Sequence, residues 1–361
     1  MTISDKIKRL PPFGDKEKTV ENVLASFGSW ITGDSDVGKY LTPENIEEID
    51  KLIRDIWKAD KYFQTGQITE CYKTIYDIIF SSSYSHEIVI THDIDIDNFF
   101  YRMRECDNEY LFSKEELFHI PFQKRQKTSN QRFSLTGYPC LYLGKSIYVC
   151  WEELNRPKIE NANIVGLKTL RLIHLLDLRM PTEIQDVSDF YRIPLIIASS
   201  VKVQEPNLPF KPEYVISQAI LHAIISHNNT ISSPNNLNGI IYYSSSVNDR
   251  QRLFDDIGLF ENIIVPTVNN TKDPNAEQIY QNGFCPVLCN TFEITNPVSF
   301  NTFQLRKDVK TTYVEWESDV KERPYNRTQM GVLEEHINTL DTQKIEPNKF
   351  FRLHPELLKR Y

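Results

Sequence analysis

The sequence predicts an α+β protein, in which an all-helical N-terminal region precedes a mixed sheet with flanking helices. Residues 16–80 carry three helical patterns separated by polar breaks. After a serine-rich stretch, short apolar runs typical of buried strands alternate with further helical patterns. An apolar fraction of 40%, with 18 Tyr and 20 Phe, is enough for a sizeable core in a chain of 361 residues.

The overall charge and the cysteine pattern argue against several classes of protein. A formal net charge of −8 disfavours broad electrostatic capture of nucleic acid, although a local basic pocket for a small phosphorylated ligand is compatible with it. No secretory signal is found and the apolar runs are too short to cross a bilayer, so we expect a cytoplasmic protein with no membrane or nucleic-acid partner. The six cysteines are scattered, and the close pair Cys285 and Cys289 has the wrong spacing for a common zinc knuckle. We expect neither disulfides nor a metal site.

The helical patterns of the N-terminal region cover residues 16–27, 43–59 and 69–80. The second pattern follows Thr42, a residue type that caps helix N-termini well. Residues 81–85 read SSSYS, a composition that suits a linker better than a helix or strand. We therefore divide the chain into a helical region at 1–85, a second domain at 86–300 and a C-terminal extension at 301–361.

The second domain opens with two predicted strands, at residues 86–97 and 99–104. Side chains repeat every second residue along a strand, so Arg102 and Arg104 lie on the same side of the second one. Either guanidinium could reach a ligand. The alternative is an ordinary surface arginine on an edge strand.

Residues 131–154, QRFSLTGYPCLYLGKSIYVCWEEL, hold an unusually dense set of chemical groups. The turn signal at 136–139 leads into a buried apolar strand at 140–143, which carries Tyr142. Ser146 stands where a helix N-cap belongs, and the helical pattern that follows it contains Glu152 and Glu153 near its end. This strand–cap–helix unit can bring one carboxylate back beside the strand tyrosine.

The rest of the second domain alternates strands and helices. We expect one or two strands at 165–178, a helical stretch at 182–201 interrupted by Pro194, a helix at 214–227, and strands at 239–244, 263–268 and 283–294 that complete the sheet. His222 lies among apolar neighbours on a helix, which favours a packing role over that of a catalytic base. Ser244 ends a buried strand, so its hydroxyl either reaches a cleft or only caps the segment that follows. One more helical pattern occupies 331–340.

These motifs, in this order, resemble the RES domain of bacterial toxins. The pattern consists of an Arg-Phe-Ser turn, a Gly-x-Pro-x-x-Tyr strand and a helix ending in Glu, with an arginine-bearing strand upstream and a serine-bearing strand downstream. In this sequence its parts are residues 101–104, 132–134, 137–142, 153, 214–218 and 239–244. The resemblance covers residues 99–268, about half of the chain.

The resemblance implies a fold similar to ADP-ribosyltransferases, in which NAD lies in a cleft of a bent or split mixed sheet. NAD would be the substrate, and no metal or separate cofactor is required. Cleavage of the nicotinamide–ribose bond passes through an oxocarbenium-like state, so Glu153 would hold the ribose hydroxyls and stabilise this cation. Arg102, together with Arg132, would bind the pyrophosphate through charge-assisted contacts. Tyr142 would stack on or confine the nicotinamide, and Ser244 would bind its carboxamide or hold Glu153 in place.

The sequence has neither a Gly-x-Gly-x-x-Gly after a strand nor a Gly-x4-Gly-Lys-Ser/Thr, so we expect neither a Rossmann nor a P-loop phosphate cradle.

We expect an NAD-consuming enzyme, a glycohydrolase or phosphorylase, that acts as a toxin or defence effector. The alternatives are a protein ADP-ribosyltransferase and a non-catalytic NAD-binding or interaction module. Members of the family are usually partnered by an antitoxin, so an antitoxin or regulatory protein is an expected partner. An oligomer is compatible with the sequence.

Overall fold

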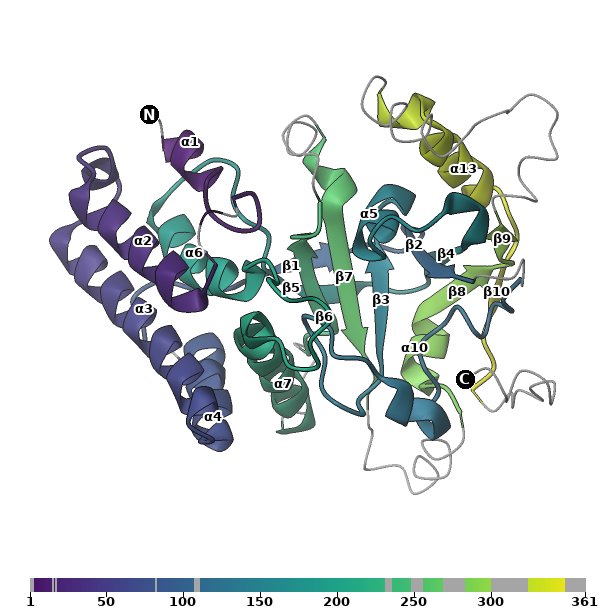
Figure 1. The fold of residues 1–361 in the computed structure, drawn as a ribbon, viewed down its shortest axis with the longest axis horizontal. Helices are drawn as coiled ribbons and strands as arrows, with labels where there is room; N and C mark the ends of the chain where they lie inside the picture. The colour runs from purple at the N-terminus through teal and green to yellow at the C-terminus, as the bar shows by residue number, and fades with distance from the viewer. Residues whose placement is uncertain are drawn as a thin grey trace.

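The computed structural model describes residues 3–14, 16, 18–81, 83–106, 111–230, 236–247, 256–268, 283–299 and 324–347. A block of N-terminal helices occupies one side of the molecule, and a large sheet with its own helices occupies the other (Figure 1). The predicted α+β class with an all-helical N-terminal region is therefore confirmed.

The N-terminal block contains four α-helices, which begin where side chains can satisfy the first free N–H groups. Thr19 accepts a hydrogen bond from the N–H of Asn22, and Thr42 forms a reciprocal capping box with Asn45. The predicted starts at 43 and 69 hold to within one residue, whereas the first long helix begins at 20 rather than 16. The helices are α1 (Ile3–Ile7), α2 (Val20–Gly33), α3 (Pro43–Gln64) and α4 (Ile68–Phe80).

The described strands join into one mixed sheet in the order β1-β5-β6-β7-β3-β2-β4-β8-β10, with β9 also paired to β4. Every strand pair is antiparallel except β5 with β6. The strands are β1 (Ile90–Ile94), β2 (Phe99–Glu105), β3 (Cys140–Gly144), β4 (Ala162–Thr169), β5 (Ile173–Asp177), β6 (Gly239–Tyr243), β7 (Glu261–Pro266), β8 (Phe292–Thr295), β9 (Val298–Ser299) and β10 (Thr342–Lys344).

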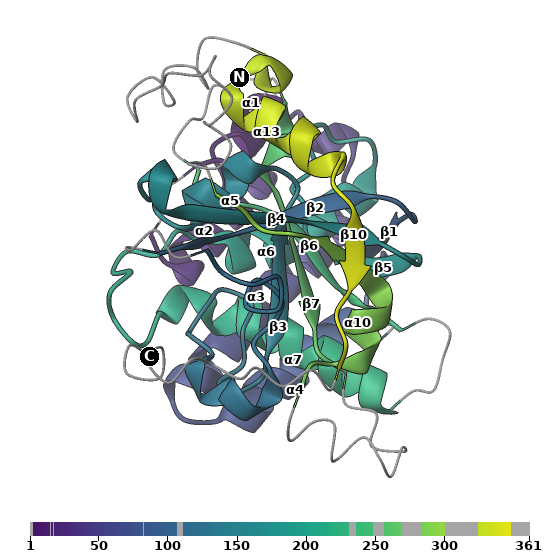
Figure 2. The same cartoon turned by 90° about the vertical axis from the view of Figure 1, so that its right-hand side faces the viewer.

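This sheet is divided between β2 and β3. The two strands pair at a single position, Tyr101 with Gly144, whereas β2 pairs with β4 over seven residue pairs and β3 with β7 over five. In Figure 2, β2 and β4 run across the view while β3 and β7 run steeply through it, so the two halves diverge from that one pair. The expected split mixed sheet is therefore present, and the division lies between β2 and β3.

Helices cover the sheet on both faces. The α-helices after the N-terminal block are α5 (Ile147–Glu153), α6 (Val187–Ser200), α7 (Val215–Thr230), α10 (Pro286–Thr291) and α13 (Gln329–Asn338). The described 3-10 helices are η1 (Val37–Lys39), η2 (Phe122–Lys127), η3 (Ile159–Asn161), η4 (Pro212–Tyr214), η5 (Ile257–Phe260) and η6 (Tyr325–Arg327). Two predictions differ from the structure. Pro194 lies inside one continuous α6 and does not interrupt it. Residues 286–291 form a helix rather than a strand. Pro286 is at the N1 position of this helix, where its missing N–H costs nothing.

The N-terminal helices and the helices α6 and α7 share one apolar core with one face of the sheet. Aromatic side chains join the two parts: the ring of Tyr72 stacks on His222 at 4.3 Å between centroids, and that of Phe80 stacks on His227 at 3.9 Å. His222 thus contacts α4, as its predicted packing role requires. Removal of residues 1–85 would expose these apolar surfaces of α6 and α7, and independent folding of residues 86–300 stays a prediction.

Candidate active site

The strand–cap–helix unit forms as the sequence predicts. The Ser146 hydroxyl accepts a hydrogen bond from the N–H of Val149 at 3.0 Å and donates to the carbonyl of Leu259 at 2.6 Å, which fixes the start of α5. Gly144 lets α5 approach β3 closely, because a Cβ there would lie 2.5 Å from Val149 Cγ1 and 2.7 Å from Cys150 Sγ. The last residue of this short helix is Glu153.

Glu153 is exposed, yet both of its carboxylate oxygens accept hydrogen bonds from neighbouring elements. Oε1 accepts from Ser244 Oγ at 2.6 Å and from Asn262 Nδ2 at 2.7 Å, and Oε2 accepts from Ser246 Oγ at 3.2 Å. The Ser244 hydroxyl in turn accepts from the N–H of Ser246 at 3.1 Å. The carboxylate is thus oriented by two serines from the segment that follows β6 and by Asn262 from β7, while one side stays open to solvent. A carboxylate held in one orientation by fixed donors can stabilise a positive charge that develops beside it.

The neighbouring carboxylate has a different environment. The side chain of Glu152 is 1% exposed and accepts two hydrogen bonds from Arg156, at 2.8 and 3.1 Å. Residues one apart on a helix point about 100° apart, so the two acids cannot serve the same site. Glu152 belongs to a local ion pair at the end of α5.

Two tyrosines, Tyr214 and Tyr242, lie close enough to Glu153 for its charge to act on them, and Tyr142 interacts with Tyr242. Tyr142 on β3 donates from its hydroxyl to the carbonyl of Phe133 at 3.0 Å, and the Phe133 ring lies 4.8 Å from that of Tyr242 on β6. Burial raises the pKa of Tyr142 and Tyr242, and the negative charge of Glu153 adds to the rise at Tyr242. Burial also raises the pKa of Tyr214. These hydroxyls therefore stay protonated at neutral pH and can donate hydrogen bonds.

Arg132 is buried and is held by the C-terminal end of α6. Its guanidinium donates to the carbonyls of Ser199 at 2.7 Å and Val201 at 2.9 Å, and to the hydroxyl of Ser245 at 2.6 Å. It also lies 5.2 Å above the ring of Tyr214. A cation at a helix C-terminus is favourable. In this geometry Arg132 fixes the loop that carries the two serines beside Glu153.

Arg102 lies at the division of the sheet. The ladder between β2 and β3 ends at Tyr101, and the carbonyl of Tyr142 accepts from Arg102 Nη1 at 3.2 Å. Burial, together with the adjacent charge of Arg104, lowers the pKa of Arg102 to about 10, so the group stays charged at neutral pH. Within the described part of the chain, its buried Nε has no hydrogen-bond partner. A half-buried cation with a buried, unused donor suits an anionic ligand.

The predicted residues form two linked groups rather than one. Glu153 and Ser244 are in direct contact, whereas no contact joins Arg102 to Glu153 among the residues that the structure describes. Tyr142 connects the groups, since its carbonyl accepts from Arg102 and its hydroxyl interacts electrostatically with Tyr242. An extended ligand would be needed to reach from the arginine to the carboxylate.

Sequence reasoning missed Asn262, Ser246 and Tyr242. Asn262 had a usable signal, because it is a buried amide in an otherwise apolar strand, where an unpaired polar group would be costly. The sequence signals for Ser246 and Tyr242 were weaker, because Ser246 is one of three consecutive serines and Tyr242 is one of 18 tyrosines in the chain. The hydrogen bond of Ser246 and the electrostatic interaction of Tyr242 with Glu153 depend on how distant segments pack together.

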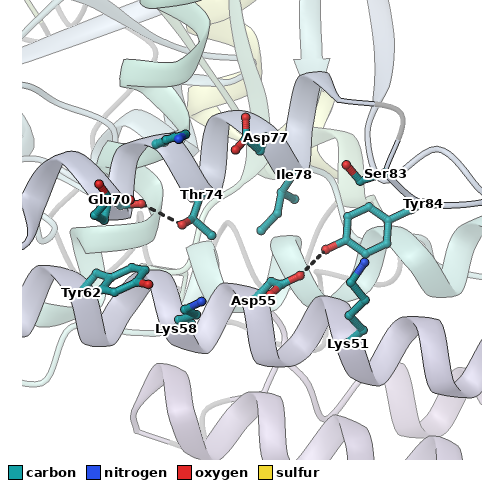
Figure 3. A pocket seen from close by; sticks show the side chains of 11 residues that line it. Lys51, Asp55, Lys58, Tyr62, Glu70, Thr74, Asp77, Ile78, Ser83 and Tyr84 are labelled. Atoms are coloured by element: carbon teal, nitrogen blue, oxygen red, sulfur yellow. Dashed lines mark hydrogen bonds between the residues drawn. The ribbon is translucent and has the colours of Figure 1, made fainter.

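A cavity of about 310 Å³ lies away from these residues, between α3 and α4 (Figure 3). Three lysines and three carboxylates line it, so the cavity favours neither anions nor cations. Asp55 already accepts from the hydroxyl of Tyr84 at 2.9 Å, and Lys51 Nζ lies 5.2 Å from the centre of that ring.

Across the described ranges, no cluster of His, Cys, Asp and Glu is placed to hold a metal ion. No described helix is long and apolar enough to cross a membrane.

Substitution of Gly144 by alanine should lower both stability and any activity that depends on Glu153. The added Cβ would overlap Val149 and Cys150, and overpacking of this kind costs about 1–3 kcal/mol. Thermal unfolding of the variant measures the loss. Gly258→Ala is the matched control, because a Cβ there meets nothing within 4 Å. Equal melting temperatures for the two variants would contradict the tight packing of α5 on β3.

The part of the chain that contains the split sheet, the Arg-Phe-Ser turn and the carboxylate held by Ser244 matches the RES domain, over residues 100–269. The chain belongs to the RES domain family. It is similar to the protein named "Putative toxin YopC" of Bacillus subtilis (strain 168), with 33% identity over 328 residues, covering 82% of this chain and 70% of that protein. No solved structure matches the chain.

Proposed function

We propose that this protein is an NAD-consuming enzyme that breaks the bond between nicotinamide and ribose, and that it acts as a toxin or defence effector. The observation that carries the proposal is the Glu153 carboxylate, open to solvent on one side and held by Ser244, Ser246 and Asn262. The toxin role is supported by the name of the Bacillus relative.

In the proposed reaction the nicotinamide leaves with the electron pair of the C–N bond, and positive charge develops on the ribose. Glu153 stabilises that charge, as carboxylates do in glycosidases. Water then supplies a hydroxyl to the sugar carbon and releases a proton, giving ADP-ribose. Inorganic phosphate in place of water would make the enzyme a phosphorylase.

Arg102 binds the pyrophosphate in this proposal, and the protonated tyrosines at 142 and 242 confine the nicotinamide ring. Ser244 acts by holding Glu153, for which its 2.6 Å hydrogen bond is suited. Arg132 is buried among backbone carbonyls, so we assign it to the loop that bears the serines rather than to direct contact with NAD. An antitoxin or other regulatory protein is the partner we propose.

The test incubates the purified 361-residue chain with NAD and measures the release of nicotinamide by chromatography. Product analysis in water and in phosphate buffer separates hydrolysis from phosphorolysis. Radiolabel from NAD retained on protein would instead indicate ADP-ribosyl transfer. Intact NAD after a long incubation with folded protein at micromolar concentration would contradict the enzymatic proposal.

A further inference from the structure

The start of α5 is held by a segment from outside the RES match. The first N–H groups of a helix have no partner within it. Of those in α5, the N–H of Val149 is satisfied by Ser146, but the N–H of Ile147 donates to Glu334 and that of Tyr148 donates to the Tyr325 hydroxyl at 3.4 Å. Glu334 and Tyr325 lie in the C-terminal part of the chain, beyond residues 100–269.

The two C-terminal side chains also hold each other. The Tyr325 hydroxyl donates to the same carboxylate oxygen of Glu334 that accepts from Ile147. Further along α13, Asn338 accepts from the hydroxyl of Tyr101 on β2 at 2.8 Å. Helix α13 therefore spans from α5 to the half of the sheet that carries Arg102, and it lies beside α5 in both views (Figures 1 and 2).

Helix α5 has seven residues, far fewer than a helix needs to be stable alone. Its position must come from its caps and its packing. Glu153 is six residues beyond Ile147, which is about 9 Å along the helix axis. Ser244 and Asn262, which orient Glu153, belong to other elements, so a loosened helix start would shift the carboxylate relative to them.

We propose that Glu334, with Tyr325, is a positioning residue for Glu153. Glu334 fixes the N-terminus of α5 and thereby the place of the carboxylate at its other end. This inference rests on the proposed NAD cleavage for its kinetic consequence. Its structural consequence, an α5 tethered by the C-terminal helix, is independent of any activity.

The kinetic test compares Glu334→Ala with Glu334→Gln in the full-length chain. Alanine removes the acceptor of the Ile147 N–H, so we expect kcat for nicotinamide release to fall roughly 10- to 100-fold, since misplacements near 1 Å can cost about 100-fold. KM should change less than about threefold, because the proposed binding groups lie on other elements. Glutamine keeps an oxygen acceptor and should stay within about threefold of wild type by the same reasoning. Glu335→Gln, an exposed neighbour on the same helix, is the control and should match wild type.

Hydrogen exchange of the amides of residues 147–149 provides the second readout. We expect faster exchange in Glu334→Ala and wild-type protection in Glu334→Gln and Glu335→Gln. If the alanine variant does not fold, Tyr325→Phe takes its place, because it keeps the carboxylate that accepts from Ile147 but removes both the acceptor of the Tyr148 N–H and the hydroxyl that donates to Glu334. Unchanged protection in the acceptor-deleting variant would overturn the positioning role. So would wild-type kcat in that variant, or an equal loss of kcat in the alanine and glutamine variants. Absence of nicotinamide release by wild type would overturn the proposed function instead, and the exchange result would still decide this inference.

The pH dependence of stability gives one more expectation for Glu334. Burial raises the pKa of its carboxyl to about 7. Because the folded-state pKa of Glu334 lies above the ordinary value, its carboxyl contributes to folding stability below about pH 4.5, and this contribution is lost as the pH rises through 7. We therefore expect the melting temperature of Glu334→Gln, relative to that of wild type at the same pH, to be higher at pH 8 than at pH 5. The opposite trend would mean that the ionised form is favoured. The titratable groups that interact with Glu334 are Tyr325, Lys145, Asp256, Tyr101 and Cys150.

Discussion

Replacement of Glu153 by glutamine is expected to lower the rate of nicotinamide release by roughly two to three orders of magnitude, or about 3 to 4 kcal/mol in activation free energy. The geometry should survive the change. A glutamine oxygen can keep the hydrogen bonds from Ser244 and Asn262, and its amide can donate to the Ser246 hydroxyl in place of accepting from it. What is lost is the negative charge that faces the developing cation.

NAD binding should change little in this variant, because the proposed binding contacts come from Arg102 and the tyrosines. Turnover assays combined with calorimetric titration of NAD separate the two effects. Glu152→Gln is the matched control on the adjacent residue. It weakens a buried ion pair with Arg156 and should lower the melting temperature. Its kcat in the folded fraction should fall less than about tenfold. A slow Glu152→Gln beside an active Glu153→Gln would reverse the two assignments.

The local part of the candidate site could be predicted because it depends on short-range signals. A strand, a serine cap and a seven-residue helix are adjacent in the chain, so the sequence is enough to place Glu153 at the end of a helix that packs on the strand of Tyr142. The contact between Ser244 and Glu153 joins residues 91 apart, and only the family pattern pointed to it.

The remaining features depend on pairings that local patterns do not encode. Asn262 reaches Glu153 because β7 lies between β6 and β3, an order that periodicity cannot give. The environment of Arg102 follows from a ladder that stops after one residue pair. The helices before and after the serine-rich segment share one apolar core, a contact that composition does not encode, and the division of the chain at residue 85 stays a prediction. In each case tertiary contacts decide what the segment does.

Substitution of Arg102 by lysine is expected to weaken NAD binding roughly 10- to 100-fold, nearly as much as substitution by alanine, because charge-assisted hydrogen bonds contribute about 1.5–3 kcal/mol each. The guanidinium donates from Nη1 to the Tyr142 carbonyl across the division of the sheet, while within the described residues its Nε has no partner. A lysine ammonium is a single point of charge. It cannot keep that bond and also contact a pyrophosphate in two places.

Calorimetric titration of NAD into the Arg102→Lys, Arg102→Ala and wild-type proteins measures the effect directly. Arg104→Lys is the matched control, since Arg104 lies two residues away on the same face of β2. Its guanidinium donates to the carbonyl of Glu116 at 2.9 Å and lies 4.4 Å above the Phe112 ring, so its replacement should leave NAD affinity within about threefold of wild type, as expected for a group without a direct ligand contact. Wild-type affinity in Arg102→Lys would mean that Arg102 only links the two halves of the sheet. In that case its replacement would lower the melting temperature without weakening NAD binding, and the pyrophosphate would have to be bound by other cations near the division.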